Sequence, residues 1–195
     1  IINGDMSIAQ RGTSTSVSAS TVAYSLDRFL TRGNSNTAHT VVQSTDAPTG
    51  FQNSLYLTRD SGQTGSLIRL QQAVETKNIV YLRGQKVTLS FYAKKDSGAT
   101  DSDLSVTLYT GDGTERARAI TAYDNEVSAI SDTATLTTSW QKFTFTSSTL
   151  ISDLSQLSIE ISYNGVGTAP SNDGYFITGV QLEAGTTASD FEFLP

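Results

Sequence analysis

The sequence has no cysteine, one histidine and one tryptophan, and no apolar run approaches the ~20 residues of a membrane-spanning helix. Without cysteine, the chain can form neither a disulfide framework nor a thiolate metal site. A single histidine excludes most nucleophile–base pairs, and the sequence contains no Gly-x-Ser-x-Gly, His-Glu-x-x-His or phosphate-binding glycine motif. Paired carboxylates remain, but 19 acidic residues supply such pairs in any fold. We therefore predict that the protein is not an enzyme.

Basic residues are also few: 13 Lys and Arg stand against 19 Asp and Glu, which gives a net charge of -6. Nucleic-acid binding depends on Lys and Arg that neutralise phosphates, so this balance argues against it. A chain of 195 residues suits one domain, residues 1–195, whose core needs no covalent cross-link. Because the sequence begins with Ile1 and not with methionine, we expect part of a longer chain or a processed form.

Alternation of apolar and polar residues predicts an all-β fold with little helix, an antiparallel β-sandwich of the jelly-roll type with about ten short strands. The clearest strand covers residues 85–95, where Leu89 and Phe91 face inward while Ser90 and Tyr92 face outward. The other predicted strands are residues 5–10, 38–45, 53–59, 66–75, 103–110, 115–121, 133–136, 140–146, 157–162 and 174–182. A short element at 24–30 and a helical turn at 77–82 complete the pattern.

Local signals predict several connections and environments. Asp112-Gly113 favours a type I′ hairpin turn that returns the chain along 115–121. Among single residues, Phe29 and Trp140 are expected in the core, because a lone aromatic residue beside apolar neighbours usually packs there. His39, without a nearby cluster of carboxylates, is expected at the surface and not at a metal or catalytic site.

The C-terminal segment, residues 174–195, organises the rest of the prediction. Its first half is apolar on both faces, which is typical of a strand in the middle of a sheet. Gly179 predicts a bulge in that strand. After a loop of small residues, Phe191 and Phe193 alternate with Glu192, so we expect these two rings to anchor an extended tail to the body of the domain.

Several segments, in order along the chain, resemble a family of bacteriophage fibre and other virion-surface β-sandwich domains. The matching segments are INGDMSIAQRGTS, YSLDRF, VTLSFYAKK, SWQKFTFT and ITGVQLEAGTTASDFEFLP. The resemblance implies a non-enzymatic virion structural protein, a homotrimeric tail fibre or receptor-binding domain for host attachment that contacts other virion proteins and a glycan of the host surface. Two alternatives stay open: a capsid head fibre or decoration protein without a sugar ligand, and a carbohydrate-binding module of a secreted glycosidase.

The two ends of the chain are also similar to those of carbohydrate-binding jelly rolls, some of which hold a structural calcium ion between the first and last strands. Where that family usually offers carboxylates, this chain has Ser7 and, in the last strand, Thr178 and Gly179. Calcium needs several oxygen ligands, so we expect no metal or other cofactor. Asp5 and Glu183 remain as weak calcium candidates.

A glycan site needs exposed aromatic rings beside hydrogen-bonding side chains. Tyr92 and Tyr109 are predicted to face outward from two strands that look adjacent, and we predict a glycan platform around them. Its polar members would be Ser90, Thr88, Thr107 and Arg118. The alternative is that the two tyrosines cover a solvated sheet or lie in a subunit interface, where tyrosine is also enriched.

Overall fold

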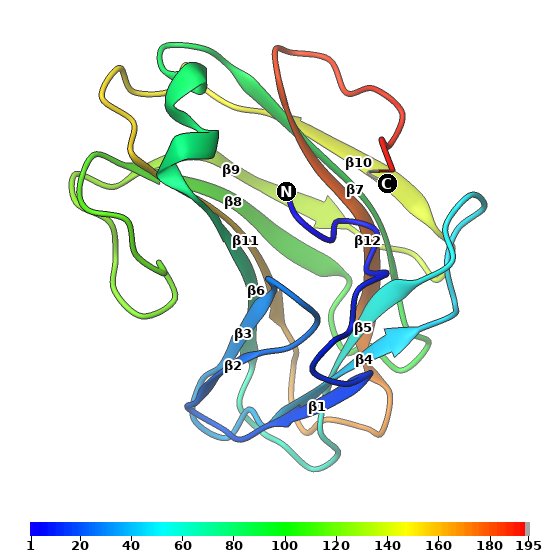
Figure 1. The fold of residues 1–195 in the computed structure, drawn as a ribbon. Coiled ribbons are helices and arrows are strands. Elements are labelled where there is room, and N and C mark those ends of the chain that lie inside the picture. The colour runs from blue at the N-terminus through cyan, green and yellow to red at the C-terminus, as the bar shows by residue number, and fades with distance from the viewer. Residues whose placement is uncertain (194–195) are drawn as a thin grey trace.

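The computed structural model describes residues 1–193, which form two six-stranded antiparallel sheets packed face to face (Figure 1). Sheet A has the strand order β1-β4-β5-β12-β7-β10, and sheet B has the order β2-β3-β6-β11-β8-β9. The predicted all-β sandwich is therefore confirmed, with twelve strands where about ten were expected. Successive strands repeatedly change sheet, so most neighbours in a sheet are distant in sequence.

The strand bounds show where the sequence pattern and the fold agree. Sheet A contains β1 (Ser14–Val17), β4 (His39–Ser44), β5 (Ser54–Arg59), β12 (Asp173–Ala184), β7 (Val87–Lys95) and β10 (Gln141–Thr146). Sheet B contains β2 (Val22–Tyr24), β3 (Leu30–Gly33), β6 (Leu67–Val74), β11 (Gln156–Asn164), β8 (Asp103–Gly111) and β9 (Val127–Thr135). The expected helical turn is confirmed as the short 3-10 helices η1 (Thr76–Asn78) and η2 (Val80–Leu82). None of the described helices is long and apolar enough for a membrane crossing.

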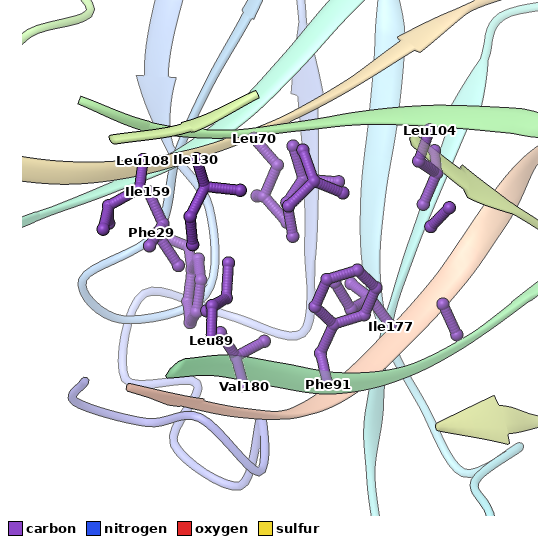
Figure 2. Packing of buried hydrophobic residues seen from close by; sticks show 14 of the residues in the cluster. Phe29, Leu70, Leu89, Phe91, Leu104, Leu108, Ile130, Ile159, Ile177 and Val180 are labelled. Carbon is purple, nitrogen blue, oxygen red and sulfur yellow. The ribbon is translucent and has the colours of Figure 1, made fainter. Parts of the chain in front are cut away.

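The core lies between the two sheets and consists mainly of inward-facing residues of the longer strands, joined by buried side chains from the connecting segments (Figure 2). Leu89 and Phe91 of β7 are fully buried, and Leu89 faces Leu108 and Ile159 of sheet B across the core. Phe29 is 1% exposed, which confirms its predicted place in the core. Burying each such side chain contributes about 1.5–3 kcal/mol, so alternation along the strands is enough to drive the layers together.

The predicted first strand at residues 5–10 is wrong, because the N-terminal segment is held by side-chain hydrogen bonds and not by a sheet. The amide of Asn3 donates to the carbonyls of Ile8 and Asp27, and its Oδ1 accepts from the Ile8 N–H. Met6 adopts a positive φ of 60° and is fully buried, whereas Ile8 is 41% exposed. Asn3 thus replaces the strand ladder with a compact loop that inserts Met6 into the core.

The predicted return strand at 115–121 is also wrong. After β8 the chain makes a detour, which we call the 112–126 loop, and the strand that pairs with β8 is β9, with Leu108 opposite Ile130. The buried side chain of Gln156 holds the start of this loop: its Oε1 accepts from the Gly113 N–H, and its Nε2 donates to the Thr114 carbonyl. A long-range side chain therefore overrides the local hairpin signal.

The predicted central strand and its bulge are confirmed in β12, which lies between β5 and β7. Gly179 has a φ of 63°, and the pairing with β7 shifts register between Thr178 and Gln181. The bulge changes which residues face the core. Ile177 and Val180, three positions apart, are both buried in the core, while Phe176 lies on the outer face.

His39 was expected at the surface, and this prediction is wrong. The residue begins β4 opposite Arg59 of β5 and is fully buried. Its Nδ1 bonds the carbonyl of Thr37, and Nε2 has no hydrogen-bond partner within residues 1–193. Burial lowers the pKa of His39, since the charged ring loses its hydration there. The neutral ring acts as a packing residue at the end of the sandwich.

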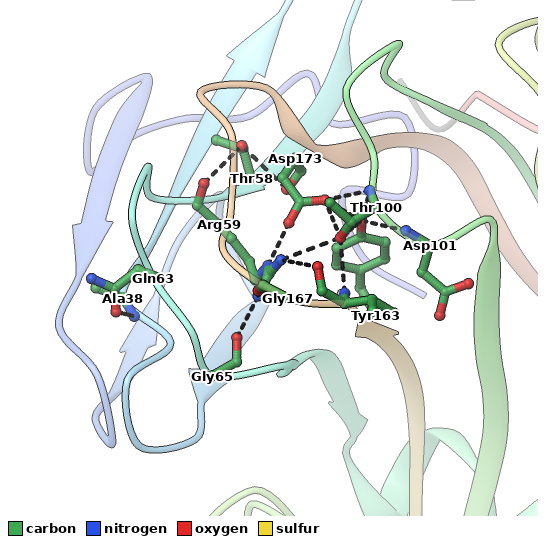
Figure 3. A network of polar contacts seen from close by, with 11 residues as sticks. Ala38, Thr58, Arg59, Gln63, Gly65, Thr100, Asp101, Tyr163, Gly167 and Asp173 are labelled. Atoms are coloured by element: carbon green, nitrogen blue, oxygen red, sulfur yellow. Dashed lines mark hydrogen bonds and ion pairs between the residues drawn. The ribbon is translucent and has the colours of Figure 1, made fainter.

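A fully buried ion pair joins β5 to β12 at the same end of the sandwich (Figure 3). Arg59 Nε lies 2.5 Å from Asp173 Oδ2, and both side chains are 0% exposed. The other guanidinium nitrogens donate to the carbonyls of Gly65, Gly167 and Val166 and to the Thr100 hydroxyl. The second carboxylate oxygen accepts from the Thr100 N–H and hydroxyl and from the Tyr163 hydroxyl.

Because this pair is satisfied on every side, removing one member leaves a buried charge without its partner. Burial, followed by the hydrogen bond to Asp173, raises the pKa of Tyr163 to about 12, so its hydroxyl stays a donor at neutral pH. The network links both sheets, since Tyr163 belongs to β11 of sheet B and Asp173 to β12 of sheet A. It fixes how the two layers meet at this end.

We predict that Asp173→Asn lowers the free energy of unfolding by about 3–5 kcal/mol, the loss typical of breaking a buried pair. Urea denaturation measures this loss in the free energy of unfolding. The Arg59→Met, Asp173→Leu double variant should lose less than the single variant, because no charge is then left buried. As a control, Glu75→Gln breaks the exposed pair with Arg28 and should leave the urea midpoint nearly unchanged. A single variant as stable as the parent would contradict the role of the pair.

Candidate functional site on the outer face of sheet A

A row of large side chains crosses the outer face of sheet A over four of its six strands, β5, β12, β7 and β10. Tyr56 of β5 is opposite Phe176 of β12, and Phe176 is opposite Lys94 of β7. Trp140 directly precedes β10, whose first pair joins Gln141 to Ala93. We call Tyr56, Phe176, Lys94 and Trp140 the aromatic row. All four side chains are half-buried, so each keeps a surface open to solvent.

The rings of the row are held by contacts with each other. Tyr56 and Phe176 stack with centroids 4.2 Å apart and planes 18° from parallel. Trp140 meets Phe176 edge-on at 6.3 Å. The ammonium of Lys94 lies 4.9 Å from the Phe176 ring centroid and 5.5 Å from that of Trp140. These are the geometries that aromatic rings and cations favour, and they preorganise the row as one surface.

Two carboxylates border the row. Asp46 accepts from Lys94 Nζ at 2.6 Å and from Trp140 Nε1 at 3.2 Å. Partial burial acts to raise the pKa of Asp46, but the hydrogen bonds from Lys94 and Trp140 hold it below its ordinary value, so the carboxylate stays ionised. At the other end, Asp96 accepts from the Tyr56 hydroxyl at 2.8 Å. Hydrogen-bond acceptors therefore flank aromatic faces on one exposed surface.

Trp140 was expected in the core, and this prediction is wrong. The residue lies at the surface in the loop before β10, where the indole N–H reaches Asp46. Sequence reasoning also missed Tyr56 and Phe176 as surface residues that act together. Their outward parity is visible in the alternation of 53–59 and 174–182, but nothing local in the sequence shows that β5 and β12 are neighbours.

A second aromatic cluster lies beside the row, over the bulge of β12. Phe51 contacts Tyr92 and Phe191 with centroid distances of 5.3 Å and 5.2 Å. A Cβ atom at Gly179 would lie 2.7 Å from Phe51 and 3.0 Å from Tyr92, so only glycine lets these rings lie on the strand. Phe193 also contacts Phe51, at 5.2 Å, but is 54% exposed.

The tail after β12 folds back over the outer face of sheet A, as the two phenylalanines predicted. Ser189 donates to Glu183 from both its N–H and its hydroxyl, and its carbonyl accepts from Lys142. Gln181 accepts from the Glu192 N–H. The tail therefore covers the part of sheet A beyond Tyr92 and leaves the aromatic row open. Leu194 and Pro195 lie outside the described residues.

The structure divides the predicted glycan platform between two surfaces. Tyr92 and Ser90 are on β7 of sheet A, whereas Tyr109 and Thr107 are on β8 of sheet B. Tyr92 is half-buried and packs against Phe51, and Ser90 is 2% exposed. Strands β7 and β8 follow each other in sequence but belong to different sheets, so the expected adjacency of Tyr92 and Tyr109 is wrong.

On sheet B, three of the predicted residues do come together. The guanidinium of Arg118 lies 3.8 Å from the centroid of the Tyr109 ring, and Tyr109 and Thr107 share the outer face of β8. Arg118 also forms a two-pronged ion pair with Glu126 at 3.0 Å and 3.1 Å. Burial and then the Glu160 carboxylate raise the pKa of Tyr109. Arg118 covers one face of the Tyr109 ring, which removes that face as a sugar platform.

The two calcium candidates line one hollow of about 370 Å³ near the N-terminal segment. Asp5 accepts a hydrogen bond from the Ser7 hydroxyl, and Glu183 accepts from Ser189. Within residues 1–193 there is no group of three or more His, Cys, Asp and Glu side chains arranged around a metal position. A calcium ion here would have to take further oxygens from the backbone or water.

Comparisons with known proteins identify the fold but not a family. No family model matches the sequence, and no curated protein is similar to it. Among solved structures, a domain of tailspike protein 4 of bacteriophage CBA120, described as enzymatically active, superposes with a TM-score of 0.59 and 14% identity. The alignment covers 94% of this chain but 21% of that one, so the protein spans about a fifth of the length of the tailspike domain.

Carbohydrate-binding modules are similar over nearly their whole length. The C-terminal family 22 module of Clostridium thermocellum Xyn10B superposes with a TM-score of 0.53, 16% identity and coverage of 85% of this chain and 91% of that one. The xylan-binding family 22 module of Paenibacillus barcinonensis Xyn10C superposes with a TM-score of 0.51 and 14% identity, and the alignment covers 89% of this chain and 99% of that one. At these identities the likeness shows a shared β-sandwich fold.

We predict that Gly179→Ala destabilises the protein by about 1–3 kcal/mol or more, because the new Cβ meets Phe51 and Tyr92 in addition to the strain of a positive φ. Gly62→Ala is the matched control: its φ is +85°, but nothing lies within 4 Å, so it measures backbone strain alone. Urea denaturation and near-ultraviolet circular dichroism of the aromatic residues report the two effects. Equal losses in both variants would show that the aromatic cluster does not depend on Gly179.

Proposed function

We propose that the protein is a non-enzymatic carbohydrate-binding module that holds a glycan on the aromatic row of sheet A. The observation that carries the proposal is the row itself: Tyr56, Phe176 and Trp140 share one exposed face, with Asp46 and Asp96 at its border. Aromatic faces stack on the apolar side of sugar rings, and carboxylates accept hydrogen bonds from sugar hydroxyls. The shared fold with carbohydrate-binding modules supports this assignment.

The row also suggests the length of the ligand. Three intervals between neighbouring strands, each about 4.8 Å, separate the Tyr56 strand from the Trp140 strand. A surface of about 14 Å takes more than one sugar ring. Because the row is open at the surface and its rings are already packed together, little ordering is needed when a chain binds. The site is therefore suited to an oligosaccharide or an internal stretch of polysaccharide.

We further propose that the module belongs to a virion-surface fibre or receptor-binding protein and that its ligand is a host-surface glycan. The resemblance of the two ends and the central strands to phage fibre domains supports this, as does the shared fold with the tailspike domain. The same resemblance implies a homotrimer, which predicts a solution mass of about three 20.8 kDa chains by light scattering. A monomer would contradict the fibre assignment but not glycan binding.

A carbohydrate-binding module of a secreted glycosidase is the second candidate, favoured by the near-complete length match with family 22 modules. In this candidate the same aromatic row binds the ligand, but the ligand is a plant cell-wall polysaccharide in place of a bacterial surface glycan. A glycan array that carries both classes separates the two candidates. A head-fibre role without a sugar ligand predicts no binding to either class.

Trp140 is the only tryptophan in the sequence, so its fluorescence reports on the row directly. We predict that the glycan identified on the array shifts the Trp140 emission and that Phe176→Ala weakens binding about tenfold, the loss of roughly one aromatic stacking contact. Tyr81→Ala, which removes an aromatic residue that is 65% exposed on η2, should leave affinity unchanged. Absence of binding on the array, or full affinity in Phe176→Ala, would refute the site.

A further inference from the structure

The opposite face of the sandwich carries a hollow of about 230 Å³ between strands β3 and β6 of sheet B and the 112–126 loop. Its lining includes three arginines, Arg32, Arg69 and Arg118, together with Gln71 and Ile120. None of the residues described as lining it is acidic. In a chain with a net charge of -6, three guanidinium groups around one small hollow make a local positive site.

The arginines are not fully neutralised by their neighbours. Arg118 pairs with Glu126, and both Arg118 and Arg69 lie near Glu160, at 3.4 Å and 3.6 Å. Arg32 donates to the carbonyl of Ala119 and has no carboxylate partner within residues 1–193. Three cations therefore share two carboxylates, and the unpaired charge lies at Arg32. An anion in the hollow would complete the balance.

Gln71 sets a second, independent requirement for the ligand of this hollow. Its side chain lines the hollow, the residue is 4% exposed, and its Nε2 donates to Glu160. Its Oε1 accepts no hydrogen bond from any of the described residues. A buried acceptor without a partner costs about 1–3 kcal/mol, so the site favours a ligand that brings a donor. A simple anion such as sulfate supplies the charge but has no O–H group to donate at neutral pH.

We propose that this hollow binds one acidic sugar residue, a sugar ring that carries a carboxylate beside its hydroxyls. The carboxylate pairs with Arg32 and Arg69, a ring hydroxyl donates to Gln71 Oε1, and the apolar face of the ring contacts Ile120, which is 73% exposed on the loop. Planar guanidinium groups match a carboxylate in two-pronged pairs. The volume lies below the ~300 Å³ of drug-sized pockets, which fits a single ring.

This site is independent of the aromatic row, because the two lie on opposite sheets. The neighbouring hollow on sheet B, of about 240 Å³, is a weaker candidate for an anion, since Glu75 and Glu115 line it. The positive hollow is also too small and too isolated on an acidic chain for a nucleic-acid backbone, which needs an extended basic surface. Its chemistry selects a small hydroxylated anion.

The test is a titration of the folded protein with D-glucuronate, followed by the backbone amide NMR signals of the 112–126 loop and of β3. We expect saturable shifts centred on Arg32 and Ile120 that weaken in about 0.5 M salt, because the interaction is charge-dependent. D-glucose, with the same ring and no charge, should bind at least about tenfold more weakly, as should sulfate, which is charged but has no O–H donor. Equal binding of glucose or of sulfate would overturn the proposal.

Two variants locate the site. Arg32→Gln should weaken glucuronate binding about tenfold, the effect of one charge-assisted hydrogen bond. Ile120→Asp places a negative charge at the exposed edge of the hollow without removing an internal contact, and should weaken binding to a similar degree. Arg83→Gln, whose parent residue donates to the Leu154 carbonyl elsewhere, is the control. Unchanged affinity in both site variants would refute the assignment.

The experiments distinguish an error in the proposed sheet B hollow from an error in the proposed glycan site on the aromatic row. Trp140 emission should stay constant while glucuronate binds on sheet B, and Trp140→Ala should retain glucuronate binding. A glucuronate titration that shifts Trp140 emission and leaves the loop signals unchanged would place the acidic sugar on sheet A and overturn the present inference. No shift of any loop signal at millimolar glucuronate would overturn it as well.

Discussion

The pairing of β5 with β12 places one buried ion pair and one exposed aromatic stack on the same two strands. Arg59 is opposite Asp173, and three residues away along each strand Tyr56 is opposite Phe176. An odd separation puts the two pairs on opposite faces of the sheet. The ion pair therefore fixes the register that creates the aromatic stack. If one strand slipped by one residue relative to the other, its member of the ion pair would turn to the outer face and lose its partner. Tyr56 and Phe176 would then no longer be opposite each other.

The bulge in β12 then lets one strand serve both faces over its whole length. Before Gly179, Ile177 faces the core and Phe176 faces outward; after it, Val180 still reaches the core although the parity has changed. Because the glycine has no Cβ, Phe51 and Tyr92 can lie directly on the strand, and the tail packs against them. The same irregularity thus ends the aromatic row and begins the region that the tail covers.

The sequence predicts what depends on local alternation and misses what depends on pairing. The strands around Phe91 and Ile159, the bulge at Gly179 and the anchored tail follow from residue type and parity. The partners of a strand are not encoded locally, so Tyr92 and Tyr109 were predicted to be neighbours although β7 and β8 lie in different sheets. Hydrogen bonds from side chains distant in sequence cannot be predicted locally either. Gln156 holds the segment after Asp112 in a loop where a hairpin was predicted, and Asp46 holds Trp140 at the surface.

The two proposed sites differ in charge in a way that limits how a glycan can use them. Sheet A offers aromatic rings beside the carboxylates Asp46 and Asp96, a surface for neutral sugars, whereas sheet B offers arginines. The buried core separates the two faces, so a short glycan cannot contact both on one protomer. A polymer with neutral and acidic residues has to pass around an edge or connect two copies of the protein. In an oligomer, that second mode raises the effective concentration at each site and gives avidity from individually weak contacts.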